Sequence, residues 1–162
     1  MLNLQDFMDR VIEAIHASDV NAYLSMIALP YQVITASGTR TFVRETDMAD
    51  HFHLFCTGLR DLGFSDLRHH VFDTVMLGET LATGTYETQL YRHDEGFVAP
   101  YRSAITLRRD AGVWRAVSTA HTIGHADWME RLQAMDRTRV SRSEGPPTRL
   151  SDASPRVGRG SA

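Results

Sequence analysis

The sequence predicts an α+β domain in which a curved antiparallel (mixed) β-sheet wraps around three helices from the N-terminal half. Three segments ahead of Gly63 repeat apolar residues at the spacing of an amphipathic helix. From Asp66 to His121, segments rich in Thr, Val, Tyr and Ile alternate with short turns that hold a Gly and an acidic residue. A sheet of such long strands is expected to curl, with the helices on its concave side.

Each predicted helix has an apolar face and a recognisable end. Asn3 is a candidate N-cap for the first helix, because its side chain can accept from the first free backbone N–H groups. Pro30 follows the second helix and Gly63 the third, and both are stop signals. The predicted spans are 4–17, then from Ser18 or Asp19 to Met26, and then from Thr46 or Asp47 to about Leu62.

The strands are predicted from alternating, β-branched segments between turns. Residues 31–36 and 39–43 flank the turn Ser37-Gly38 and form a hairpin at one end of the sheet. Four longer strands follow, and their short turns make successive strands antiparallel. Their predicted spans are 66–77, 81–92, 98–109 and 113–121.

The C-terminal part of the chain has a different composition. Residues 126–135 predict one more short amphipathic helix, and residues 138–162 are rich in Ser, Pro, Gly and Arg. A segment with so few apolar residues cannot bury enough surface to order itself. We therefore expect a domain over 1–136 and a flexible, disordered tail over 137–162.

Composition and charge exclude several classes of function. The tail has six arginines against two acidic residues, a net charge of +4, and the body has 11 arginines against 18 acidic residues, a net of −7. An acidic body is unsuited to nucleic acid. No apolar run approaches the roughly 20 residues of a membrane span, and the N-terminus lacks a signal-peptide pattern. Cys56 is the single cysteine, so we expect a reducing, cytoplasmic location.

Three stretches of the sequence resemble one known superfamily. They are HASDVNAYLSMIALPYQV (16–33), LGETLATGTYE (77–87) and LRRDAGVWRAV (107–117). They look like the NTF2-like superfamily, a cone-shaped fold that includes SnoaL-like cyclases and ketosteroid isomerase, and the resemblance covers about 4–121. It implies a pocket between the concave sheet and the helices, and a homodimer through the convex sheet face. The fold hosts both enzymes and binding proteins.

The resemblance to the isomerase branch does not extend to its catalytic residues. Its tyrosine and two aspartates fall at Val11, at Thr35, and at Ser103 or Ala104. A general base needs a pKa near the working pH, and none of these side chains has one without an activating partner. Isomerase chemistry by that mechanism is therefore not expected.

A set of candidate site residues follows from the predicted strands and helix faces. His121 ends the last strand, where it would act as a general base or hydrogen-bond partner, or lie exposed to solvent. Asp73 and Glu87 are the acids that could face inward beside it, if the strand register allows. Tyr86 and Tyr101 either line a pocket or pack across strands. The aromatic ligand-binding candidates are Tyr23, Phe52, Phe55, Tyr86 and Tyr101.

No metal site or cofactor is predicted. His51 and His53 are two residues apart on a helix and lie on different faces. His69 and His70 alternate on a strand, so one points inward and one outward. A transition-metal site needs three or more convergent ligands, and no dinucleotide-binding or phosphate-binding loop is present either.

Three functions remain open from the sequence. The first is a small-molecule-binding domain with an unidentified ligand. The second is a SnoaL-like cyclase, dehydratase or isomerase that uses His121 with Asp73 or Glu87. The third is a dimerisation module without a ligand. A carboxylate with a shifted pKa beside His121 would favour the enzyme, an apolar pocket the binder, and a filled core the dimerisation module.

Overall fold

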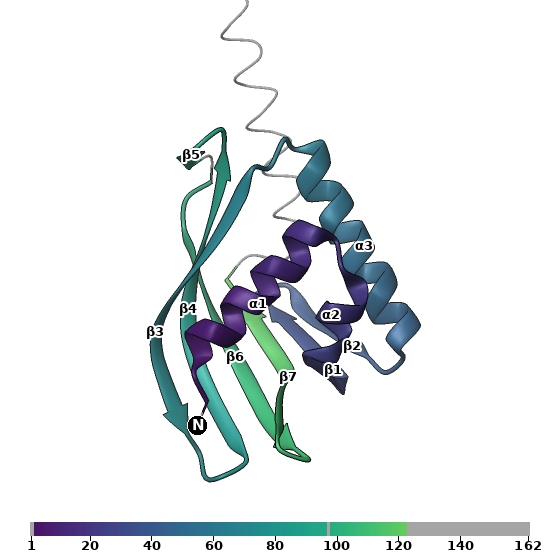
Figure 1. Cartoon of the computed structure of the whole chain (residues 1–162), viewed down its shortest axis with the longest axis vertical. Helices are drawn as coiled ribbons and strands as arrows, with labels where there is room; N and C mark the ends of the chain where they lie inside the picture. Colours follow the sequence, from purple (N-terminus) through teal and green to yellow (C-terminus); the bar gives the residue numbers. More distant parts are fainter. Residues whose placement is uncertain (1, 97, 123–162) are drawn as a thin grey trace, which may run out of the picture.

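The structure is a computed structural model, and it describes residues 2–96 and 98–122 (Figure 1). The helix predicted over 126–135, the tail over 137–162 and the boundary between them lie outside these residues. In chain order the elements are α1 (Leu4–Ala17), α2 (Val20–Ser25), β1 (Ile27–Thr35), β2 (Gly38–Phe42), α3 (Glu45–Asp61), β3 (Asp66–Met76), β4 (Leu81–Arg92), β5 (Glu95–Gly96), β6 (Tyr101–Asp110) and β7 (Val113–His121).

The first two helices begin where side-chain caps can form. The Asn3 side chain accepts hydrogen bonds from the backbone N–H groups of Gln5 and Asp6, which confirms the predicted cap of α1. Asp19 caps α2 in the same way. The sequence predicts Thr46 or Asp47 at the start of the third helix, but α3 begins at Glu45, and Arg44 at the N-cap position makes no side-chain capping bond. Asp47 instead lies in the first turn of α3, where it pairs with Arg44 at 2.6 Å.

The strands form one mixed, curved sheet that is not closed (Figure 1). The strand order is β2-β1-β7-β6-β4-β3, and β5 pairs with β4. Successive strands pair antiparallel, as their turns predict, whereas β1 and β7 pair in parallel. The hairpin of β1 and β2 lies at one end of the sheet, which confirms its predicted position.

The first strand begins earlier than the sequence predicts. Pro30 is expected to precede the strand, but β1 begins at Ile27 and contains Pro30. The backbone there is held from one side by β7, which pairs with β1 at Ile27 and again from Gln32 onward. The register shifts between these two positions. Pro30 lies in this irregular stretch, where a residue without an N–H group is tolerated.

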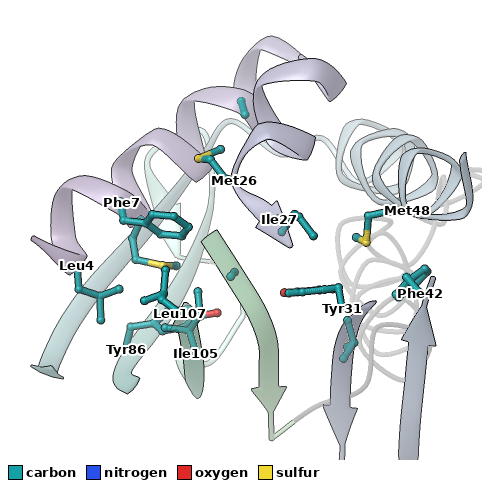
Figure 2. Close-up of a cluster of buried hydrophobic side chains, with 14 residues drawn as sticks. Leu4, Phe7, Met26, Ile27, Tyr31, Phe42, Met48, Tyr86, Ile105 and Leu107 are labelled. Atoms are coloured by element: carbon teal, nitrogen blue, oxygen red, sulfur yellow. The ribbon is translucent and has the colours of Figure 1, made fainter. Parts of the chain in front are cut away.

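The helices cover one face of the sheet, and the core lies between the two layers (Figure 1). Figure 2 shows part of it, with Leu4 and Phe7 of α1 lying over Leu107 of β6. A second cluster joins α3 to β3 and β4 through buried residues such as Phe52 and Leu90. The apolar faces predicted for α1 and α3 are therefore the faces that fix these helices over the sheet.

A β-bulge interrupts β3, and it decides which side chains of this strand face the helices. Val71 pairs with Tyr86, but the next pair joins Asp73 to Thr85, so Phe72 is the extra residue. The side chain of Gln5 on α1 bridges the strand edge here. Its amide N–H donates to the carbonyl of His69 at 3.0 Å, and its carbonyl accepts from Val71 at 3.1 Å.

No helix within the described part of the chain is long and apolar enough to cross a membrane.

Candidate functional site

A cavity of about 90 Å³ lies between the helices and the concave face of the sheet. It is partly open to solvent, and side chains of all three described helices and of five strands line it. The lining residues are Phe7, Met8, Val11, Ile15, Tyr23, Ile27, Tyr31, Val33, His51, Phe52, Phe55, Leu67, His69, Tyr86, Thr88, Tyr101, Ile105, Ala116, Thr119 and His121.

The cavity combines an apolar wall with neutral polar groups. Buried residues such as Phe7, Ile105 and Ala116 supply the apolar surface. Among the described lining residues there is no aspartate, glutamate or arginine. The polar atoms come from tyrosine, threonine and histidine side chains, so the site offers hydrogen bonds without a permanent charge.

Two tyrosine hydroxyls reach the cavity from strands that lie on either side of β7 and β6, both on the concave face of the sheet. In Figure 2, Tyr31 on β1 and Tyr86 on β4 extend toward one another. The Tyr31 hydroxyl donates to the Thr119 hydroxyl at 2.9 Å. Burial raises the pKa of Tyr31 to about 12 and raises that of Tyr86 further, although a hydrogen bond to Ser103 opposes the shift of Tyr86. Both hydroxyls are therefore protonated at neutral pH.

A serine and a histidine form a second polar group on the last two strands. Ser103 on β6 and His121 on β7 are register partners, and Ser103 Oγ lies 2.8 Å from His121 Nδ1. The Tyr101 ring stands edge-on to the His121 ring, with centroids 6.4 Å apart. Burial raises the pKa of Tyr101 to about 12, and a hydrogen bond to Thr88 acts in the opposite direction.

His69 brings a second imidazole to the cavity from β3. Its Nδ1 atom is buried and has no hydrogen-bond partner among the described residues. Burial lowers the pKa of His69 to about 4, against smaller upward effects of a hydrogen bond to the Met8 backbone and of the nearby Asp9. His69 is therefore neutral at pH 7.

The structure brings together six of the eight site residues that the sequence proposes. His121 and the aromatic candidates line one cavity, and Tyr23 stacks on Phe52 with ring centroids 4.5 Å apart. These six residues come from α2, α3, β4, β6 and β7. The six residues are His121, Tyr23, Phe52, Phe55, Tyr86 and Tyr101.

The two acidic candidates lie on the other face of the sheet. Glu87 follows Tyr86 on β4, and neighbouring strand residues point to opposite faces, so only Tyr86 reaches the cavity. Asp73 is exposed and pairs with Thr85, which is also exposed. The bulge at Phe72 turns Asp73 away from the helices, and no sequence signal marks that bulge. The predicted pairing of His121 with either acid is therefore not present.

Several lining residues are absent from the sequence-based set. Tyr31, Thr88 and Thr119 are buried residues with hydroxyl groups on three different strands. A neutral hydroxyl on a predicted strand gives no signal of its own, because its face depends on the register. His69 was within reach, since the alternation of His69 and His70 already predicts that one of them points inward.

The described residues contain no group of three or more His, Cys, Asp or Glu side chains that could hold a metal ion. His51 and His69 both line the cavity, whereas His53 and His70 are exposed. Cys56 lies on the buried face of α3, and burial raises the pKa of its thiol.

Comparisons with known proteins agree with this architecture. The chain is similar to an NTF2-like protein of unknown function from Shewanella oneidensis, with 12% identity, a TM-score of 0.59, and coverage of 74% of this chain and 95% of the other. It is also similar to a domain of unknown function with a cystatin-like fold from Nostoc punctiforme, with 10% identity, a TM-score of 0.60, and coverage of 88% and 95%.

A third similar structure is a ketosteroid isomerase-like protein from Erwinia carotovora, with 15% identity, a TM-score of 0.53, and coverage of 72% of this chain and 90% of the other. At these identities the likeness concerns the fold alone. A comparison with curated proteins gave no match. Residues 3–122 match the family model described as NTF2-like protein (DUF6841), and the chain therefore belongs to this NTF2-like family.

Proposed function

We propose that this domain binds a small, neutral, mainly apolar molecule in the cavity between the sheet and the helices. The observation that carries the proposal is the chemistry of the lining, in which apolar side chains surround a few convergent hydroxyl and imidazole groups. Ligand sites in proteins usually have this composition, with polar groups that fix orientation inside an apolar wall.

The lack of a charged lining group supports a neutral ligand. A buried charge is costly unless it is paired, and the described lining residues include no aspartate, glutamate or arginine that could pair with one. The tyrosine hydroxyls remain protonated because burial raises the pKa of Tyr31 and Tyr101 to about 12. They offer hydrogen bonds to a neutral ligand and no charge to an ionic one.

The volume limits the part of the ligand that is enclosed. Pockets for drug-sized ligands are roughly 300–1,000 Å³, so the cavity of about 90 Å³ encloses a small group. Because the cavity is partly open, a single aromatic or alicyclic ring can be held with one side toward solvent. A compound much longer than one ring would extend through the opening.

Two matched variants test whether the cavity is the binding site. Ala116 is buried and lines the cavity, whereas Ala120 lies on the same strand, half-buried, and points to the opposite face. Ala116→Leu fills the cavity, and we expect it to weaken toluene binding at least tenfold in an NMR titration. Ala120→Leu adds the same atoms outside the cavity and should leave the affinity within about twofold. Equal affinities in both variants would contradict the proposal.

Catalysis is a second candidate, and the Ser103–His121 pair is the observation that favours it. A serine activated by a histidine is a common nucleophile, but the histidine is normally oriented by a third group such as a carboxylate. The acids proposed for that role, Asp73 and Glu87, lie on the other face of the sheet. His121→Gln separates the two functions, since it keeps a hydrogen-bonding group but cannot act as a base. Binding predicts an affinity within about threefold of the original, whereas catalysis predicts complete loss of turnover.

A further inference from the structure

The polar groups that line the cavity differ in whether the protein itself satisfies their hydrogen bonds. The Tyr31 hydroxyl is engaged with Thr119, that of Tyr86 with Ser103, and that of Tyr101 with Thr88. His69 Nδ1 is buried and has no hydrogen-bond partner among the described residues. Buried polar atoms in native proteins are nearly always paired, and His69 lines the cavity, so its unpaired nitrogen indicates a missing partner.

The surroundings of His69 determine which kind of partner is missing. The hydrogen bond from the ring to the Met8 backbone uses the N–H of the other ring nitrogen, because Nδ1 has no partner. In the neutral ring only one nitrogen carries a proton, so Nδ1 presents a lone pair and accepts. The ring is held in place by Tyr86, which it meets edge-on with centroids 4.9 Å apart.

The strand backbone around His69 is already satisfied. The Gln5 amide donates to the His69 carbonyl and accepts from the Val71 N–H, and its remaining hydrogen bond goes to Asp9 at 2.8 Å. Gln5 therefore satisfies the His69 carbonyl and the Val71 N–H at the edge of β3. The Nδ1 atom of His69 still lacks a hydrogen-bond donor among the described residues.

We propose that His69 Nδ1 accepts a hydrogen bond from a hydroxyl or N–H group of the ligand, so that the cavity selects neutral molecules with such a donor on a small apolar body. The inference rests on the proposed function and makes it more specific. Phenols and small cyclic alcohols have this chemistry. A carboxylate does not, because its oxygens would face the Nδ1 lone pair without a proton between them.

Phenol and toluene are the probes that isolate this hydrogen bond, because they have nearly the same shape and differ in one hydroxyl. In the full chain labelled with ¹⁵N-histidine, we expect phenol to shift the Nδ1 resonance of His69 and toluene to leave it nearly unchanged. We also expect phenol to bind roughly threefold to tenfold more tightly than toluene, the effect of one neutral hydrogen bond. The resonance shift needs no variant, so it decides the matter even if a substitution disturbs folding.

His69→Leu and His70→Leu are the matched variants, since His70 is the exposed neighbour on the same strand. His69→Leu should remove the preference for phenol while toluene still binds, and His70→Leu should keep the preference. If phenol and toluene bind the unaltered protein equally, or if the preference survives in His69→Leu, the inference is overturned and the proposed function stands. Binding of neither compound would overturn both.

Discussion

At the scale of single residues, burial rather than charge pairing sets the chemistry of the cavity. Burial raises the pKa of Tyr31 and Tyr101 to about 12 and lowers that of His69 to about 4, because the ionised form of each is poorly solvated. The upward and downward shifts have the same cause, since the charged form is the anion of tyrosine and the cation of histidine. These three side chains are therefore uncharged across the whole physiological pH range.

The low pKa of His69 predicts a loss of stability in mild acid. Burial lowers the pKa of His69 to about 4 in the folded protein, whereas the pKa of a histidine in an unfolded chain is about 6.5. As the pH falls from 6.5 to 4, the unfolded state gains a proton that the folded state does not, and the free energy of unfolding decreases. The contribution of His69 to this decrease is about 3 kcal/mol by pH 4.

Chemical denaturation at several pH values measures this effect. The decrease between pH 6.5 and 4 should be smaller in His69→Phe than in the unaltered chain, and Asp9, which favours the protonated ring, is unchanged in both. His70→Phe removes an exposed neighbouring histidine and should retain the decrease. Parallel pH profiles for the unaltered protein and His69→Phe would show that His69 is not held neutral by burial.

At the scale of elements, the approach of α1 to the sheet depends on one residue without a side chain. Gly84 lies on β4, and a Cβ added there would meet Leu4 Cδ2 at 2.2 Å and the Asp73 carbonyl oxygen at 2.7 Å. The first of these is a buried core side chain on α1, and the second is backbone. Neither can move without disturbing the layer that forms the cavity.

Gly84→Ala is therefore expected to destabilise the fold by about 1–3 kcal/mol, the usual cost of overpacking a core. Gly96→Ala is the control. An added Cβ there meets the amide nitrogen at the end of the flexible Gln89 side chain, at 2.9 Å, and this end can move away. Thermal unfolding of both variants gives the comparison. Equal melting temperatures for Gly84→Ala and the unaltered chain would show that α1 does not lie this close to β4.

The elements themselves were largely predictable, and the places where prediction failed have local causes. The α1 cap at Asn3 and the long strands β3 and β4 follow from periodicity and turn residues. The start of β1 did not, because it depends on the pairing of Ile27 with Ala116 of β7, a long-range contact that the local sequence does not mark. The side of the sheet to which Asp73 points was not predictable either, because it depends on the bulge at Phe72, which arises from the pairing of β3 with β4.

At the scale of the whole molecule, the convex face of the sheet carries exposed apolar side chains. Phe72, Val75 and Leu81 lie on the hairpin of β3 and β4, and Val75 is 44% exposed. Contiguous exposed apolar surface often marks an interface. We propose that two copies of the chain associate through this face, as the sequence resemblance also implies.

A substitution that introduces charge tests the association. Val75→Arg should shift the protein toward the 18.2 kDa monomer in sedimentation at micromolar concentration. Leu54→Arg is the matched control, since Leu54 is 71% exposed and lies on α3, in the helix layer that covers the other face of the sheet. A monomeric unaltered protein, or a dimer that is insensitive to Val75→Arg, would argue against this interface.

The central claim is that the cavity beneath the helices, and not the exposed apolar hairpin, holds the ligand. Isotope-filtered NOE spectra of the protein with toluene measure this directly. We expect contacts from the toluene protons to Ile105 and Val33, which line the cavity. Contacts confined to Phe72 and Val75 on the convex face, or no contacts at millimolar toluene, would contradict it.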